Sequence, residues 1–474
     1  MKSKLFVVFL VFVLLVPVLL NCGSLAVAQT KQQVTPDVFV GIDVAYENMT
    51  AIKSLIDEVS AYTNLFVIGC TGITYNQTKL TEICQYLYDR NMSFIVYRDY
   101  SRRNSTEWFP VWVENAKAKW GDNFLGFYYS DEIGGKQLDR QDHMVFVDAV
   151  DAHDAANKFI EVVNSQLNRF ITSHNSSTPI PLFTSDYALY WFDYKAGFDT
   201  VFAQFGWNYS RQLNVALCRG AATVQNKDWG VIVVWEYTVP PYLGSGQQLF
   251  EDLVLAYENG AKYIVVFDSD EEYTQTILKQ EHLDALKQFW EYVKNKPRQA
   301  NPVSERVAFV LPKDYAYGFR GPTDKIWGLW EASAFDHQLS VNVNSLLEQY
   351  GAKLDIIYDD GLEQGNTYGY SQFIFWNDTT RFPTLYPTPS PSPTTTPSPI
   401  PTATPIQSPS PSPSPTPPPN QSATPSPSST QQPTTSPEPQ NTPINYSYTL
   451  VAGVTIGVVV ASALVVLRKK LIKN

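Results

Sequence analysis

Short apolar runs recur along the first part of the chain, and each is followed by a segment with helical spacing. The runs are rich in Val, Ile, Phe and Tyr, and they begin near Val38, Leu65, Ser93, Phe124, Ile180, Thr200, Gly230 and Lys262. Runs of this kind are typical of buried β-strands. Between them apolar residues recur every three or four positions, which predicts amphipathic helices. Eight strands alternating with helices predict an α/β fold, a (β/α)8 TIM barrel over residues 36–298.

An open doubly wound sheet is the alternative fold. No Gly-rich phosphate loop follows the first predicted strand, which argues against a nucleotide-binding version of it. Within the barrel, we expect a helix over residues 106–119 capped by Ser105, and one long helical region over residues 139–170. Residues 301–382 predict a small α/β accessory module. Its expected strands are residues 306–311, 354–358 and 372–376, with a helix near residues 341–350.

Polar side chains follow most of the predicted strands. They are Asp43, Asp99, Asp131, Glu132, Asp186, Gln204, Glu236 and Asp268. The carboxyl ends of the strands of a TIM barrel meet at one rim, where active sites are built. For Asp43, Asp99 and Asp186 the alternative role is to cap the next helix. Glu is a poorer N-cap, so Glu132 on the fourth strand and Glu236 on the seventh, read as residues 230–236, are the catalytic candidates.

Two carboxyl groups that flank a glycosidic bond are sufficient for its hydrolysis. An acid on the fourth strand and a Glu on the seventh resembles the arrangement of the clan A retaining glycoside hydrolases. The resemblance implies that Glu132 is the acid/base and that Glu236 is the nucleophile. The clan usually has Asn before the fourth-strand Glu, where this chain has Asp131. Repulsion from Asp131 would raise the pKa of Glu132, which suits a proton donor.

A carbohydrate is the ligand that the remaining candidates favour. Trp207 and Tyr237 lie just past predicted strand ends, where aromatic faces stack on sugar rings. With them, the predicted substrate-binding residues are Asp43, Asp99, Asp131, Asp186, Gln204 and Asp268. The histidines lack the spacing of a zinc site, so no metal or other cofactor is expected. The net charge of -11 argues against nucleic acid as a partner.

The two ends of the chain predict a protein anchored in the cell membrane. Residues 1–28 have the charged start, apolar run and small-residue cleavage site of a signal peptide. Residues 383–443 are rich in Pro, Ser and Thr and predict a disordered stalk. Residues 448–467 are apolar enough for one transmembrane helix, and the basic tail 468–474 places the C-terminus in the cytoplasm. Asn-x-Ser/Thr sequons from Asn48 to Asn445 are typical of an extracellular glycoprotein.

The sequence therefore predicts a hydrolase tethered to the cell surface that cleaves extracellular glycans by a two-carboxylate, retaining mechanism. The alternative is a non-catalytic carbohydrate-binding or structural cell-surface protein with a degenerate glycosidase barrel. Cys70, Cys84 and Cys218 remain after signal cleavage. A Cys70–Cys84 disulfide and three buried thiols are both compatible with these positions.

Overall fold

The computed structural model describes residues 37–99, 107–174, 179–299, 301–321, 323–362 and 368–382. The predicted signal peptide (1–28), stalk (383–443), transmembrane helix (448–467) and basic tail (468–474) lie outside these residues. Among the residues that are described, no helix combines the length and the apolar character needed to cross a membrane.

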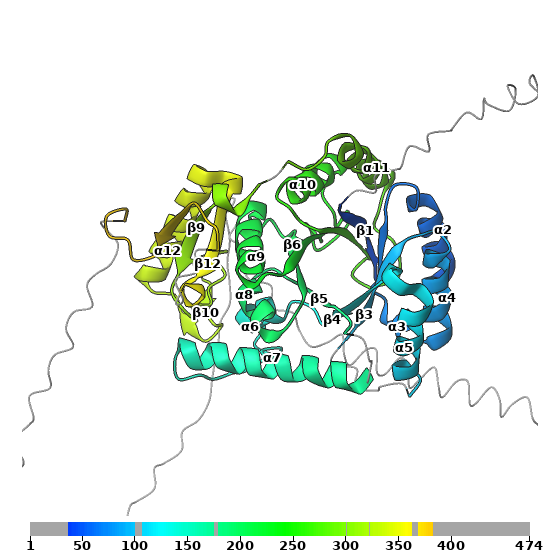
Figure 1. Cartoon of the computed structure of the whole chain (residues 1–474), viewed down its shortest axis with the longest axis horizontal. Helices are drawn as coiled ribbons and strands as arrows, with labels where there is room; N and C mark the ends of the chain where they lie inside the picture. The colour runs from blue at the N-terminus through cyan, green and yellow to red at the C-terminus, as the bar shows by residue number, and fades with distance from the viewer. Residues whose placement is uncertain are drawn as a thin grey trace, which may run out of the picture. The chain divides into compact units, whose positions relative to one another are not determined.

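Eight parallel strands close into a barrel in sequence order, which confirms the predicted (β/α)8 architecture (Figure 1). Closure comes from the pairing of the first strand with the last, in which Gly41 lies opposite Val265. The strands are β1 (Phe39–Val44), β2 (Leu65–Ile68), β3 (Ser93–Arg98), β4 (Phe124–Tyr129), β5 (Leu182–Asp186), β6 (Thr200–Phe205), β7 (Asp228–Val233) and β8 (Tyr263–Asp268).

Helices on the outside of the barrel follow the strands. They are α2 (Met49–Val59), α3 (Thr71–Thr74), α4 (Gln77–Tyr88), α5 (Phe109–Trp120), α6 (Ile133–Asp139), α7 (Ala152–His174), α8 (Tyr190–Ala196), α9 (Arg211–Gln225), α10 (Gly246–Glu258) and α11 (Gln280–Asn295). Helix α7 confirms the expected helical region over 139–170 from residue 152 onward, but residues 140–151 are irregular. A separate short helix, α6, begins four residues after the end of β4. The predicted cap Ser105 lies outside the described residues.

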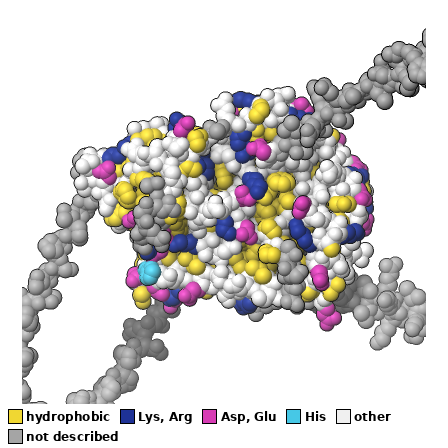
Figure 2. Space-filling view, viewed as in Figure 1, with side chains coloured by type: hydrophobic (Ala, Val, Ile, Leu, Met, Phe, Trp, Pro, Cys, Tyr) yellow, Lys and Arg dark blue, Asp and Glu magenta, His cyan; other side chains and the backbone are white. Residues whose placement is uncertain are grey.

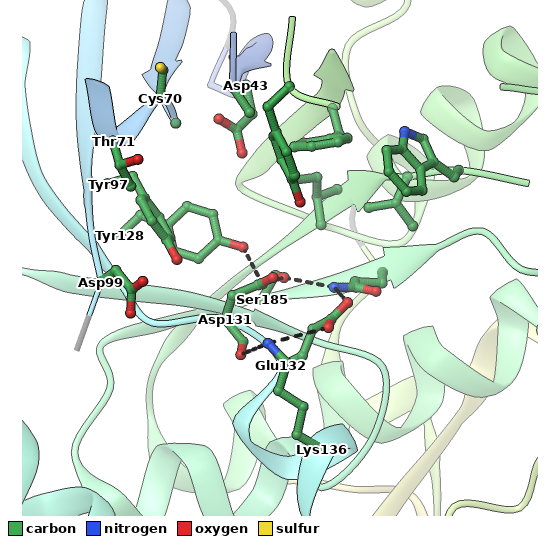
Figure 3. Close-up of a pocket in the computed structure, with 18 of the residues that line it drawn as sticks. Asp43, Cys70, Thr71, Tyr97, Asp99, Tyr128, Asp131, Glu132, Lys136 and Ser185 are labelled. Carbon is green, nitrogen blue, oxygen red and sulfur yellow. Dashed lines mark hydrogen bonds and ion pairs between the residues drawn. The ribbon is translucent and has the colours of Figure 1, made fainter. Parts of the chain in front are cut away.

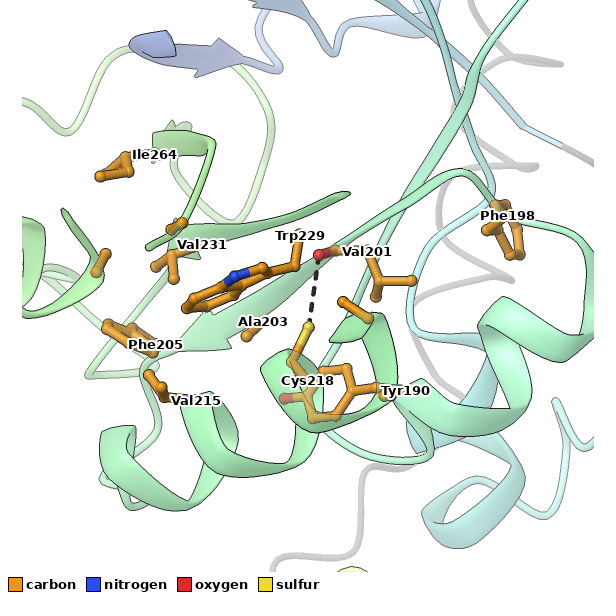
Figure 4. Packing of buried hydrophobic residues seen from close by; sticks show 14 of the residues in the cluster. Tyr190, Phe198, Val201, Ala203, Phe205, Val215, Cys218, Trp229, Val231 and Ile264 are labelled. Carbon is orange, nitrogen blue, oxygen red and sulfur yellow. Dashed lines mark hydrogen bonds between the residues drawn. The ribbon is translucent and has the colours of Figure 1, made fainter. Parts of the chain in front are cut away.

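The barrel interior is filled with side chains, which leaves room for a ligand only at its ends. The interior cluster consists of Leu65, Val67, Ile95, Tyr128, Phe183, Phe202, Ile232, Tyr263 and Val265. A second apolar layer lies between the strands and the helices. Figure 4 shows part of this layer, in which Val215 and Cys218 of α9 face the strands and the Cys218 thiol contacts the Val201 carbonyl at 3.6 Å. The three described cysteines are free and buried.

A small α/β module follows the barrel. Its parallel sheet has the order β12 (Leu354–Tyr358), β9 (Val307–Leu311), β13 (Gln372–Phe375), and it is accompanied by α12 (Ala334–Tyr350) and the hairpin of β10 (Lys325–Ile326) and β11 (Trp330–Glu331).

Asp355, on β12, joins this module to the barrel. Its buried carboxylate accepts hydrogen bonds from Arg219 Nε of α9 at 2.7 Å, Arg306 Nη1 at 2.7 Å and the Tyr370 hydroxyl at 2.7 Å. Helix α9 therefore packs against both the accessory module and the barrel: Arg219 binds β12, and Cys218 contacts β6.

Replacing Asp355 with Ala should strongly destabilise the fold, since two guanidinium groups would lose their buried counter-charge. We expect the free energy of unfolding to fall by about 3–5 kcal/mol. Urea denaturation of the full-length chain followed by tryptophan fluorescence measures this change. The matched control is Asp122→Ala, at a fully exposed side chain, which should change the value by less than about 0.5 kcal/mol. Equal midpoints for both variants would contradict the role assigned to Asp355.

Candidate active site

A pocket of about 770 Å³ opens at the carboxyl ends of the barrel strands. This volume is within the usual range for small-molecule sites. Six of the predicted site residues line it: Asp43, Asp99, Asp131, Glu132, Gln204 and Trp207. The other four, Asp186, Glu236, Tyr237 and Asp268, are not among its lining residues.

A strained turn after β4 brings two acids to the pocket. Ser130 and Glu132 both have left-handed backbone conformations, with φ of 60° and 54°. Such conformations cost about 1–3 kcal/mol each for residues other than Gly, and they persist only where their surroundings enforce them. The Glu132 amide donates to the Ser185 carbonyl at 2.9 Å, which fixes the turn against β5. The Glu132 carboxyl makes no capping bond to α6 and is therefore available to the pocket.

Asp186 does the capping that Glu132 does not. Its carboxylate accepts hydrogen bonds from the amides of Gly134 at 2.6 Å and Gly135 at 2.8 Å, at the start of α6. A Cβ atom on Gly135 would lie 2.1 Å from the Tyr187 ring, so only Gly allows this close approach. Burial raises the pKa of Asp186 to about 7, against the effect of these amide bonds. The structure thus gives Asp186 the capping role and not a place in the pocket.

The Glu132 carboxyl is held between two side chains. Oε1 accepts a hydrogen bond from Gln204 Nε2 at 2.9 Å, and Oε2 lies 3.5 Å from Lys136 Nζ, one turn along α6. Burial is the main cause of a raised pKa for Glu132, and the adjacent charge of Asp131 raises it further. Lys136 and Gln204 oppose this rise. A carboxyl group in this setting keeps its proton at higher pH than an ordinary Glu.

Asp131 lies in a contrasting environment. Its Oδ1 accepts hydrogen bonds from the Tyr128 hydroxyl at 2.7 Å and from Ser185 Oγ at 2.6 Å (Figure 3). These hydroxyl groups hold the Asp131 carboxylate in place beside Glu132, so two carboxyl groups with different partners lie at one end of the pocket.

Asp43 comes from β1, three strands away from β4 in the barrel. Its side chain is 4% exposed, and a Cβ atom on Gly69 would lie 2.3 Å from its Oδ1, so the carboxyl group packs against bare backbone. Among the described residues, Oδ1 has no hydrogen-bond partner. Figure 3 shows the carboxyl group directed into the pocket, across from Glu132. Burial, followed by the charges of Asp131 and Asp268, raises the pKa of Asp43 well above its usual value.

Glu236 is placed differently from the sequence prediction. Strand β7 ends at Val233, where its pairing with β8 ends, so Glu236 lies three residues beyond the strand. The chain turns there, and the Glu236 amide donates to the Tyr242 carbonyl at 2.7 Å. The Glu236 carboxylate accepts a hydrogen bond from Arg211 Nη2 at 2.6 Å. Tyr237, which follows, is 49% exposed and also lies outside the pocket lining.

Asp268 has a structural role in the loop after β8. Its Oδ1 accepts hydrogen bonds from Thr276 Oγ1 at 2.9 Å and the Ile277 amide at 2.8 Å. This carboxyl group fixes the path of the chain from β8 to α11, and it does not line the pocket.

Several pocket residues were not predicted from the sequence. They are Tyr97, Tyr128, Lys136, Ser185, Trp235 and Tyr273. A signal existed for Lys136, because it follows Glu132 by four residues, the spacing of one helical turn. Tyr128 and Ser185 lie within strands, and nothing in their spacing distinguishes a pocket residue from a core residue.

Removing the cap of α6 should loosen the helix that follows Glu132. In Asp186→Ala, four backbone amides lose their acceptor, those of Gly134, Gly135, Tyr187 and Ala188. We expect faster hydrogen exchange over residues 130–139 and a loss of about 1–3 kcal/mol in the free energy of unfolding. Mass spectrometry of peptic peptides measures the exchange. The control is Asp228→Ala, at the start of β7, which should leave α6 unaffected. Unchanged exchange in α6 of Asp186→Ala would show that this cap is dispensable.

Neither a protein-family model nor a curated protein matches this chain. The solved structures that it resembles include a glycoside hydrolase family 5 enzyme from Prevotella bryantii B14, at 10% identity and a TM-score of 0.34, over 55% of this chain and 98% of that one. A beta-1,4-D-mannanase from Cryptopygus antarcticus has 14% identity and a TM-score of 0.37, over 53% and 90%. Thiamine phosphate pyrophosphorylase from Pyrococcus furiosus has 11% identity and a TM-score of 0.29, over 55% and 97%. Likeness at this level does not bear on the chemistry of the pocket.

Proposed function

We propose that this protein is a glycoside hydrolase that cleaves extracellular glycans while tethered to the cell surface by residues 448–467. The observation that carries the proposal is the pair Asp131 and Glu132 at the end of β4. The Glu132 carboxyl group is buried and has a raised pKa, and the neighbouring Asp131 carboxylate accepts hydrogen bonds from two hydroxyl groups. Both line a pocket whose other walls carry aromatic side chains suited to sugar rings.

In the proposed reaction, Glu132 donates its proton to the glycosidic oxygen as the bond to the anomeric carbon breaks. The negative charge of Asp131 stabilises the positive charge that develops on the sugar. Gln204 and Lys136 keep the Glu132 carboxyl in place. Water then adds to the anomeric carbon, and its proton restores the acid form of Glu132.

This proposal modifies the clan A assignment. Glu236 is engaged by Arg211 outside the pocket lining, so it is not the partner of Glu132 in the proposed mechanism. The same observation favours the alternative of a carbohydrate-binding protein without turnover, because the pocket then lacks the nucleophile that the resemblance implied. The two alternatives differ in what Glu132 does.

Glu132→Gln should reduce glycan hydrolysis by about 10²–10⁴-fold, because a positioned acid contributes that much to the rate. The measurement is release of reducing ends by the full-length chain in mild detergent, against a panel of polysaccharides. Glu251→Gln, the same change on the exposed face of α10, is the control and should retain the wild-type rate. If wild type cleaves none of the panel yet binds its members, the protein is a binder. Complete loss of turnover in Glu236→Gln, with the fold intact, would instead restore the clan A assignment.

The pH dependence offers a separate test. Glu132 must be protonated to act, so the rate should fall as pH rises through its raised pKa. The charge of Asp131 raises that pKa and the charge of Lys136 lowers it. Hence Asp131→Asn should move the alkaline limb of the kcat/KM profile to lower pH, and Lys136→Gln should move it to higher pH. Shifts in the same direction, or no shifts, would rule out Glu132 as the titrating acid.

A further inference from the structure

Resting on the proposed function, we propose that the substrate is a polysaccharide of amino sugars with free, positively charged amino groups, one of which binds against Asp43. Asp43 lines the same pocket as Glu132, and its ligand would define the substrate class of the proposed reaction.

The two halves of the pocket differ in chemistry. Asp43 lies in β1, Asp99 follows β3 and Asp131 follows β4, so the part of the pocket formed by β1 to β4 carries these three acids. The opposite wall, from β6 to β8, is largely apolar and aromatic: Trp207, Ile232, Val234, Trp235 and Phe267. A sugar stacked on the aromatic wall would direct its substituents toward the acids. Carboxylated or sulfated sugars would meet repulsion there, whereas an ammonium group would be attracted.

The basic side chains around the pocket contact groups other than the Asp43 carboxylate. Lys136 contacts Glu132 and donates to the Asp131 carbonyl at 2.9 Å. Arg140 is exposed and lies 3.5 Å from Asp142. Lys79 forms an ion pair with Glu47, the acid at the pocket edge. In the part of the chain that is described, no ion pair to Asp43 is formed.

Asp43 is the residue most in need of a ligand. Its carboxyl group is almost completely buried and directed into the pocket. Oδ1 packs against Gly69 and has no hydrogen-bond partner among the described residues, so a ligand in the pocket would meet Oδ2. An ammonium group has three donors, and a charge-assisted bond to Asp43 Oδ2 would favour the ionised form of the carboxyl group.

A metal ion fits this wall poorly. Within the described residues, no three His, Cys, Asp or Glu side chains are grouped closely enough to hold one. Separated acids suit a ligand that carries its charges on successive sugar rings. Acidic and basic side chains are interspersed over the face shown in Figure 2, so the preference for a cation would come from the pocket and not from a uniformly charged surface.

Isothermal titration calorimetry on full-length Glu132→Gln, which should bind without cleaving, tests the inference. The probes are a glucosamine hexamer, fully deacetylated, and the fully N-acetylated hexamer, at a pH where the amines are charged. We expect the glucosamine hexamer to bind about tenfold more tightly, the equivalent of one good hydrogen bond. Adding Asp43→Asn should abolish this preference, and adding Asp122→Asn, the same change at an exposed position, should preserve it.

A second measurement avoids any change at Asp43, in case that variant does not fold. The two hexamers are compared as inhibitors of hydrolysis by the wild-type chain, and the glucosamine hexamer should be the stronger. Equal or tighter binding of the N-acetylated hexamer overturns the inference and leaves the proposed hydrolase intact if wild type cleaves neutral glycans. Preferential binding of the glucosamine hexamer without any turnover supports the ligand class and overturns the hydrolase.

Discussion

The hydrogen bonds from the Gly134 and Gly135 amides to the Asp186 carboxylate are the constraint on which the candidate site depends. The first turn of α6 needs an acceptor, and the residue before the helix would ordinarily supply it. Because Asp186 on β5 accepts these hydrogen bonds, the Glu132 side chain does not cap the helix. The left-handed backbone of Glu132 then turns its carboxyl group toward the pocket, and the capped helix holds the strained turn in place.

Carboxyl groups that share one pocket repel one another when they are ionised, and the three acids of this pocket differ in their hydrogen-bond partners. Asp131 has two hydroxyl donors, Glu132 has one amide donor and a lysine at 3.5 Å, and Asp43 has an oxygen with no described partner. Burial, followed by the charge on Asp131, raises the pKa of both other acids. The raised pKa of Glu132 suits proton donation, whereas Asp43 has to be ionised to bind a cation, a form that a bound ammonium group would favour.

The barrel could be predicted from the sequence because parallel strands buried on both faces are nearly continuous apolar runs, and eight such runs alternate with helical spacing. The ends of the strands could not be predicted as well. The run from Gly230 continues through Trp235, but the ladder with β8 stops at Val233, so Glu236 falls in the following turn. Likewise, strand-end carboxylates look alike in sequence. Only the tertiary contacts distinguish Asp186, which caps a helix, from Asp43, which faces the pocket.

The accessory module holds the other end of the helix that starts after Glu132. Arg320 binds the Asp139 carboxylate through Nη1 at 2.5 Å and Nη2 at 2.8 Å, and Gln137 Nε2 donates to the Trp327 carbonyl at 3.0 Å. A seven-residue helix is too short to be stable alone, so these contacts and the Asp186 cap together determine its position. The accessory module thus contributes contacts that position a helix of the candidate site. By fixing α6 from its C-terminal end, it also fixes Lys136, and through Lys136 the electrostatic environment of Glu132.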